Sequence, residues 1–113
     1  MTTIPYDFLA PDDCQTMAEV RAGVDAMDAQ IVALLGERFA YMRAAARIKT
    51  DRAAVRDEDR KASVIAAAKD AARAAGVPEP LVAAMWEMLV ESSIAYEMAI
   101  FDAGVGSVKG ATE

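Results

Sequence analysis

The sequence predicts an all-α fold of three helices with a long first helix, and composition and periodicity carry that prediction. Hydrophobic residues make up 55% of the 113 residues, and there are only 6 Gly and 4 Pro, which is a helix-forming composition. An apolar stripe with heptad-like spacing runs through residues 16–50, which is long for a globular helix and typical of a bundle. Because three lone helices of this length make a thin core, we expect a second copy of the chain to complete the burial.

The two ends of the chain are expected to lie outside the helical domain. Residues 1–11 contain Pro5 and Pro11 without a helical period, so we expect an extended arm there. The helical domain then spans residues 12–103, and residues 104–113 have the composition of a flexible tail. The N-terminus lacks a basic segment followed by an apolar core, so we expect no signal peptide.

The first helix is expected to run from Thr16 to about Thr50. Thr16 and Glu19 have the spacing of a capping box, with Asp12 and Asp13 as alternative, slightly earlier starts. Its inward stripe consists of Val20, Val24, Met27, Ile31, Leu34, Arg38, Tyr41, Ala45 and Ile48.

Two cations share the inward direction of this helix. Arg38 belongs to the stripe, and Lys49, at 100° per residue, points within roughly 20° of the same direction and about 16 Å further along the axis. Burying two positive charges is costly unless an anion meets them. The pattern therefore predicts an anion-binding site and not only a core.

The second helix is expected from Asp57, a good N-cap, to about Ala75, before the stop signal at residues 76–78. Periodicity lapses over residues 51–56, which we interpret as a loop that either folds over a ligand or is simply a mobile connector. The expected inward line of the second helix is Arg60, Val64, Ala68, Ala71 and Ala75.

The third helix is expected over residues 79–103 and is apolar on two faces, which indicates burial between neighbours. The first face consists of Leu81, Met85, Met88, Ser92, Ala95 and Ala99. The second face consists of Trp86, Val90, Ser93, Glu97 and Phe101. Ser93 and Glu97 are thus polar residues within an apolar stripe.

Charge and residue usage exclude several classes of function. The net charge of −6 argues against binding of nucleic acid or an anionic membrane, whereas the Arg residues concentrated between Arg38 and Arg60 suit a small anionic ligand. One cysteine, Cys14, and no histidine leave no Cys/His zinc site, catalytic triad or histidine base, and we expect neither metal nor cofactor. The unpaired cysteine and the short apolar runs predict a soluble cytoplasmic protein.

Arg21 fits this site only if a second copy supplies it. It precedes Arg38 by seventeen residues, or roughly 25 Å along a helix, which no small ligand spans. An antiparallel second copy of the first helix would bring the two arginines together. The simpler interpretation is that each cation is a solvated or snorkelling residue and that Glu97 only pairs with a nearby base. Periodicity alone supports no more than an anion-binding helical bundle.

Several motifs resemble those of a known family. They are Pro11-x-Asp13-Cys14, Arg21-x-x-x-Asp25-x-x-Asp28, Leu35-x-x-Arg38, Tyr41, Ala44-Ala45-x-Arg47-x-Lys49 and Arg60. Over about residues 11–103 the chain resembles the all-helical chorismate mutases, above all the subgroup that includes the isochorismate pyruvate lyases of salicylate synthesis. The resemblance implies the chorismate mutase type II fold. In that fold two chains intertwine as a homodimer, and each of the two active sites borrows an arginine from the partner's first helix.

The resemblance also implies roles for the cations. Arg21 of the partner and Arg38 would clamp the carboxylates of a small dianionic substrate, for which a planar guanidinium is the right donor. Lys49 would bind a carboxylate and the ether oxygen between the ring and the enolpyruvyl side chain. Arg60 would support the carboxylate or the closing loop.

Three further positions follow from the same resemblance. Asp57 would contact the ring hydroxyl, and Ser93 would lie near a carboxylate. Glu97 stands where the family commonly has a Gln that donates to the ether oxygen. Because a Glu donates only when protonated, we expect either that burial keeps Glu97 protonated or that activity rises toward acid pH.

The implied reaction is the pericyclic rearrangement of chorismate to prephenate, which needs a clamp and fixed cations at the ether oxygen. The alternative is the isochorismate pyruvate lyase reaction, which yields salicylate and pyruvate in the same kind of site. Lys61 favours this alternative, because the family's mutases often have a Glu there. A further alternative is a non-catalytic helical dimer that binds another anion or a partner helix.

Overall fold

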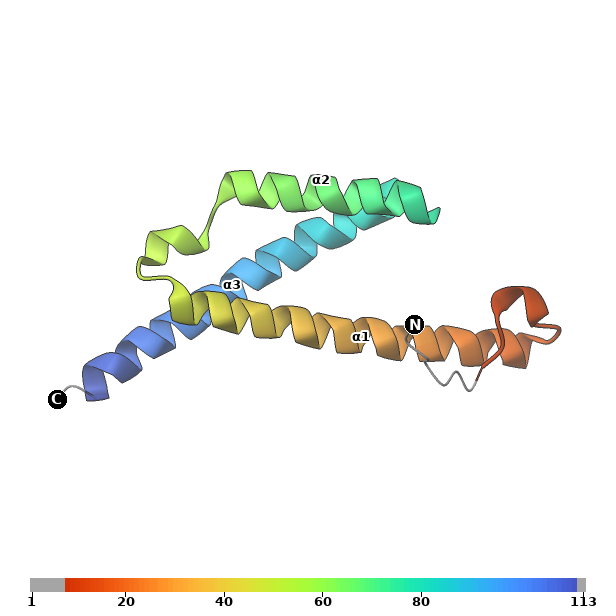
Figure 1. The fold of residues 1–113 in the computed structure, drawn as a ribbon, viewed down its shortest axis with the longest axis horizontal. Helices are drawn as coiled ribbons and strands as arrows, with labels where there is room; N and C mark the ends of the chain where they lie inside the picture. Colours follow the sequence, from red (N-terminus) through yellow and green to blue (C-terminus); the bar gives the residue numbers. More distant parts are fainter. Residues whose placement is uncertain (1–7, 112–113) are drawn as a thin grey trace. The chain divides into compact units, whose positions relative to one another are not determined.

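The computed structural model describes residues 8–111, with side chains described as far as Gly104, and it confirms the predicted all-α fold of three helices (Figure 1). The elements are η1 (Pro11–Asp13), α1 (Met17–Ile48), η2 (Arg52–Val55), α2 (Glu58–Ala75) and α3 (Glu79–Ala111), where η denotes a 3-10 helix. The chain divides into two compact units, the N-terminal unit Met1–Arg38 and the C-terminal unit Phe39–Glu113, and α1 belongs to both.

The predicted capping box begins α1. The backbone N–H of Glu19 donates to Thr16 Oγ1 at 3.1 Å, and Glu19 Oε1 accepts from the N–H of Thr16 at 3.0 Å and of Gln15 at 2.8 Å. These N–H groups, that of Gln15 first, hold the pKa of Glu19 below its ordinary value. The alternative starts, Asp12 and Asp13, lie in η1 instead.

In the N-terminal unit, the end of the arm packs on α1. A Cβ built on Gly23 would lie 3.7 Å from Phe8 Cδ2, so the arm is in van der Waals contact with the helix at this glycine. Between them lies an apolar groove of about 320 Å³. Its lining includes Phe8, Leu9, Pro11, Cys14, Val20, Val24 and Met27. Residues 1–7, the rest of the predicted arm, lie outside the described residues.

The apolar stripe of α1 is largely exposed in the single chain. Its members Val24, Ile31 and Leu34 are 52%, 51% and 63% exposed, and Tyr41 and Ile48 are exposed as well. A row of large apolar side chains along one face of a helix is unusual on a protein surface unless another surface covers it. This exposure agrees with the expectation that one chain does not complete its own core.

The connection between α1 and α2 is more ordered than predicted. Residues 52–55 form η2, and Asp51 caps it by accepting from the N–H of Ala53 at 3.0 Å. Val55 is buried with Ala46 and Phe101 in the core of the C-terminal unit. The lapse in periodicity therefore marks a short 3-10 helix anchored by one apolar side chain.

Both ends of α2 agree with the prediction, but the buried face does not. Asp57 caps its start, and Gly76 ends it in the left-handed conformation at φ 72°. Val64 and Ala68 of the predicted inward line are half-buried, but its other members, Arg60, Ala71 and Ala75, are exposed, and the buried residue is Ala72. The helix is turned by about one residue, because it packs on α3 through the line that begins at Lys61.

The second apolar face of α3 is buried as predicted, at Val90, Ser93, Glu97 and Phe101. Every member of the first face is exposed, from Leu81 and Met85 to Ala99. The helix continues to Ala111, beyond the end expected near residue 103, since the segment contains no proline to stop it. Despite the apolar character of α3, no helix in the described part of the chain is long and apolar enough to cross a membrane.

Candidate functional site

A partly buried ion pair lies at the centre of the candidate site in the C-terminal unit. Lys49, directly after α1, donates from Nζ to Glu97 Oε2 on α3 at 2.6 Å. Glu97 is only 4% exposed, whereas the side chain of Lys49 keeps 30% of its surface exposed. The ammonium therefore stands between a buried carboxylate and solvent, where an anionic ligand could reach it.

Ser93 lies one helical turn before Glu97 on the same face of α3 and is 3% exposed. Its Oγ donates to the backbone carbonyl of Leu89 at 2.7 Å. A hydroxyl rotates freely between acceptors, so it can leave that carbonyl for a carboxylate oxygen. Of the predicted residues, Ser93 and Glu97 thus lie on one buried strip of α3, and Lys49, directly after α1, contacts that strip at Glu97.

An aromatic contact joins the last part of α1 to α3 beside this strip. The rings of Phe39 and Tyr96 meet edge to face with centroids 4.9 Å apart, and Arg43 donates to the Tyr96 hydroxyl at 2.8 Å. Sequence reasoning assigned no role to Arg43, because it lies off the apolar stripe. Its pairing with a tyrosine 53 positions away is a tertiary contact that no local pattern announces.

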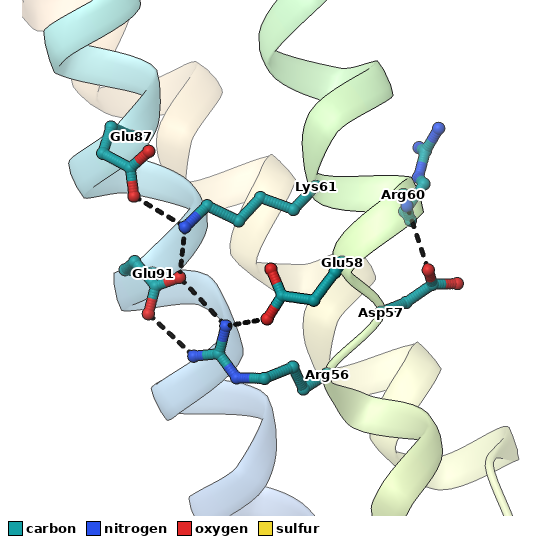
Figure 2. Close-up of polar contacts among 7 residues, drawn as sticks. All are labelled: Arg56, Asp57, Glu58, Arg60, Lys61, Glu87 and Glu91. Atoms are coloured by element: carbon teal, nitrogen blue, oxygen red, sulfur yellow. Dashed lines mark hydrogen bonds and ion pairs between the residues drawn. The ribbon is translucent and has the colours of Figure 1, made fainter.

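Asp57 and Arg60 lie together at the start of α2. Asp57 Oδ1 accepts from the backbone N–H of Arg60 at 2.9 Å, which caps the helix. Figure 2 shows the Arg60 side chain on the other side of α2 from Lys61, directed away from α3. Arg60 is exposed, so its guanidinium is directed outward and not toward the core as the predicted inward line required.

Lys61, which is half-buried, takes the inward position that was predicted for its neighbour Arg60. Its side chain is 18% exposed, and Nζ lies 2.7 Å from a carboxylate oxygen of Glu87 and 2.7 Å from one of Glu91, both on α3 (Figure 2). Hydrogen bonds to Glu87 and then Glu91 raise the pKa of Lys61. The cation at the unusual position is therefore neutralised within the fold.

Two bidentate ion pairs hold the connection between α1 and α2 on α3. Arg56 contacts both carboxylate oxygens of Glu91, at 2.7 and 3.1 Å, and also reaches Glu58 (Figure 2). Arg52 contacts both oxygens of Asp102, at 2.9 and 3.3 Å. The hydrogen bonds from Arg56 and then Lys61 lower the pKa of Glu91 to about 2. Sequence reasoning missed both pairs.

Arg21 and Arg38 belong to the N-terminal unit. Arg21 is exposed and Arg38 is half-buried. Both lie on the continuous helix α1, where their seventeen-residue separation corresponds to about 25 Å. The two arginines of one chain thus cannot hold the same small molecule.

The chain matches known proteins over most of its length. A family model described as chorismate mutase type II matches residues 20–98. The chain is also similar to an isochorismate pyruvate lyase from Pseudomonas aeruginosa. The two are 31% identical over 88 residues, which cover 78% of this chain and 87% of that relative. The family match includes every residue predicted for the site, namely Arg21, Arg38, Lys49, Asp57, Arg60, Ser93 and Glu97.

Proposed function

This chain belongs to the type II chorismate mutase family, and on that premise we propose that it catalyses the rearrangement of chorismate to prephenate. The observation that carries the proposal is the ammonium of Lys49 held 2.6 Å from the buried carboxylate of Glu97. The rearrangement needs no nucleophile. It needs a flexible dianion held in a reactive shape and charge placed at the ether oxygen, which becomes more negative in the transition state.

In the proposed site, cations clamp the substrate's carboxylates. Arg38 holds one carboxylate, and Lys49 contacts a carboxylate and the ether oxygen. Asp57, with one oxygen engaged in capping α2, meets the ring hydroxyl with the other. Ser93 supports a carboxylate from α3. Arg60, whose exposed guanidinium is directed away from α3 in the single chain, supports a carboxylate or the closing loop from α2. A guanidinium fork suits this task, because it binds both oxygens of a carboxylate in one plane.

We propose that the chain acts as an intertwined homodimer in which the partner supplies Arg21. Two observations support this. The apolar stripe of α1 is exposed in the single chain, and a single α1 keeps Arg21 about 25 Å from Arg38. An antiparallel second α1 would cover the stripe and would bring the partner's arginine to the site.

A second candidate reaction is the conversion of isochorismate to salicylate and pyruvate. It is favoured by the similarity to a relative named isochorismate pyruvate lyase. Lys61 supports the same candidate. The family's mutases often have at this position a Glu that serves the ring hydroxyl, whereas the ammonium of Lys61 is bound to Glu87 and Glu91. The two reactions share the clamp, so they differ in which ring isomer the site accepts.

The proposed shared site is tested by mixing two inactive variants. We expect Arg21→Ala and Arg38→Ala each to lose activity by about 100-fold or more, because each removes one carboxylate ligand. In a refolded equal mixture, each mixed dimer keeps one site with both arginines, so about a quarter of the wild-type activity should return.

The control is a mixture of Arg38→Ala with itself after the same refolding, which should stay inactive. A mixture of the two variants that stays inactive although mixed dimers are detected by mass would contradict the supply of Arg21 by the partner. Full activity in both variants would instead show that Arg21 and Arg38 have no role in catalysis.

A further inference from the structure

We propose that Glu91 and Asp102 on α3 are positioning residues, which hold the connection between α1 and α2 in place and thereby set Asp57 and Arg60 for the substrate. The inference rests on the proposed function, because Asp57 and Arg60 are substrate ligands only if that function is right. Neither carboxylate would touch the substrate. Each would act through an arginine of the connection.

The two ion pairs lie at the two ends of η2. At its start, Arg52 Nε and Nη2 contact the two oxygens of Asp102 at 2.9 and 3.3 Å. Just after its end, Arg56 Nη2 and Nη1 contact the two oxygens of Glu91 at 2.7 and 3.1 Å. A bidentate pair fixes orientation as well as distance, so each one restricts the backbone on which its arginine lies.

A third anchor lies between the two pairs. Val55 is 4% exposed and packs with Ala46 and Phe101. The connection is thus held at its beginning, middle and end, each time against residues of α3 or the end of α1.

The last anchor is adjacent to the proposed substrate ligands. Arg56 directly precedes Asp57, whose carboxylate caps α2 through the N–H of Arg60. Figure 2 shows the continuous path from Glu91 through Arg56 to this cap. Glu58 and Lys61 join the same cluster, so the first turn of α2 is tied to α3 on one side while Arg60 faces the other.

The fold contains a matched pair that lacks this relation to the site. Arg73, near the end of α2, donates to Glu79 at 2.8 Å at the start of α3. It is also a contact between a guanidinium and a carboxylate of α3, but it is a single contact, and Arg73 pairs with Asp70 as well. Arg73 lies at the opposite end of α2 from Asp57, about 24 Å away along the helix. If the ion pairs only stabilise the fold, removing a carboxylate at either end of α2 should have the same effect on the substrate site.

The test compares Glu91→Gln and Asp102→Asn with Glu79→Gln in the full-length protein. The first measurement is amide hydrogen exchange without substrate at Ala53, Ala54 and Arg60, whose N–H groups are bonded within or next to the connection. We expect exchange there to rise by about tenfold in the first two variants and to stay at the wild-type rate in Glu79→Gln. Unchanged exchange in Glu91→Gln and Asp102→Asn would overturn the proposal.

The second measurement separates KM from kcat for whichever of chorismate and isochorismate the wild type converts. We expect KM to rise about tenfold in Glu91→Gln and Asp102→Asn with kcat changed less than about threefold, because the ligands are looser before substrate binds. The exchanged pair Arg52→Asp with Asp102→Arg should restore KM toward the wild-type value. Equal effects in Glu79→Gln, or no rescue by the exchanged pair, would contradict positioning.

The two measurements also separate this inference from the proposed function. A wild type that converts neither substrate refutes the proposed function. The exchange measurement still decides whether the two carboxylates order the connection.

Discussion

Glu97 is a carboxylate in a position where the proposed chemistry needs a hydrogen-bond donor. It is 4% exposed and accepts from Lys49 at 2.6 Å. The ether oxygen of a bound substrate would therefore face one hydrogen-bond donor, Lys49, and one acceptor, the carboxylate of Glu97. A glutamine at this position would place a second donor there in place of the acceptor.

We therefore expect Glu97→Gln to raise kcat/KM by about tenfold or more, because its amide supplies the donor that the carboxylate lacks. The measurement is kcat/KM of the wild type and of Glu97→Gln at neutral pH. A lower value in the variant would contradict the role of Glu97.

Glu91 makes a different prediction at the residue scale, concerning stability. Arg56 and Lys61 lower its pKa from 4.5 to about 2 in the folded state. The folded state therefore binds fewer protons than the unfolded state between these values, so this stabilisation is present above pH 4.5 and is lost as pH falls toward 2. We expect the free energy of unfolding to depend less on pH in this window in Glu91→Gln than in the wild type.

The measurement is urea unfolding at a series of acid pH values. Arg56→Met removes the first cause of the shift and should flatten the same window. A wild-type slope retained in both variants would show that other carboxylates cause the acid sensitivity.

Residues that interrupt an apolar stripe could be predicted from the sequence, and residues that depend on distant partners could not. Ser93 and Glu97 are buried as their place in the stripe indicated. The burial of Lys61 depends on Glu87 and Glu91, which lie on another helix. No periodicity within α2 distinguishes Lys61 from Arg60 as the inward cation, because both precede similar alanine-rich lines.

At the scale of elements, local signals predicted where helices begin and tertiary packing decided which way they face. The Thr16–Glu19 box, Asp57 and Gly76 each mark an end through their own backbone chemistry. The orientation of α2 is harder to read, since alanines lie all around it and give no strong apolar face. The ion pairs of Lys61 with α3 agree with the orientation that the helix takes.

The orientation of α2 is tested by one pair of variants. Ala72 is 4% exposed and faces α3, so Ala72→Leu should overfill the contact and lower the free energy of unfolding by about 1–3 kcal/mol. Ala71→Leu adds the same side chain at an exposed position and should change it by less than about 0.5 kcal/mol. Urea unfolding measures both. A larger loss of stability in Ala71→Leu than in Ala72→Leu would support the inward line predicted from the sequence.

At the scale of the whole molecule, the sequence and the structure both indicate that one chain does not bury all of its apolar surface. The stripe of α1 and the first face of α3 are apolar but exposed in the single chain. A second copy stays a prediction, which rests on thin burial and on the distance between Arg21 and Arg38. Which ring isomer fits could not be predicted, since that depends on contacts with a hydroxyl that a helical period does not encode.

We propose that the cations that clamp the substrate's carboxylates promote a pericyclic reaction of chorismate. The most direct measurement is an assay of the purified protein with chorismate and with isochorismate in parallel, following prephenate and salicylate. We predict that chorismate is converted with the higher kcat/KM and that Lys49→Met abolishes the conversion. Salicylate as the dominant product would assign the site to the lyase reaction, and consumption of neither substrate would contradict the proposed chemistry altogether.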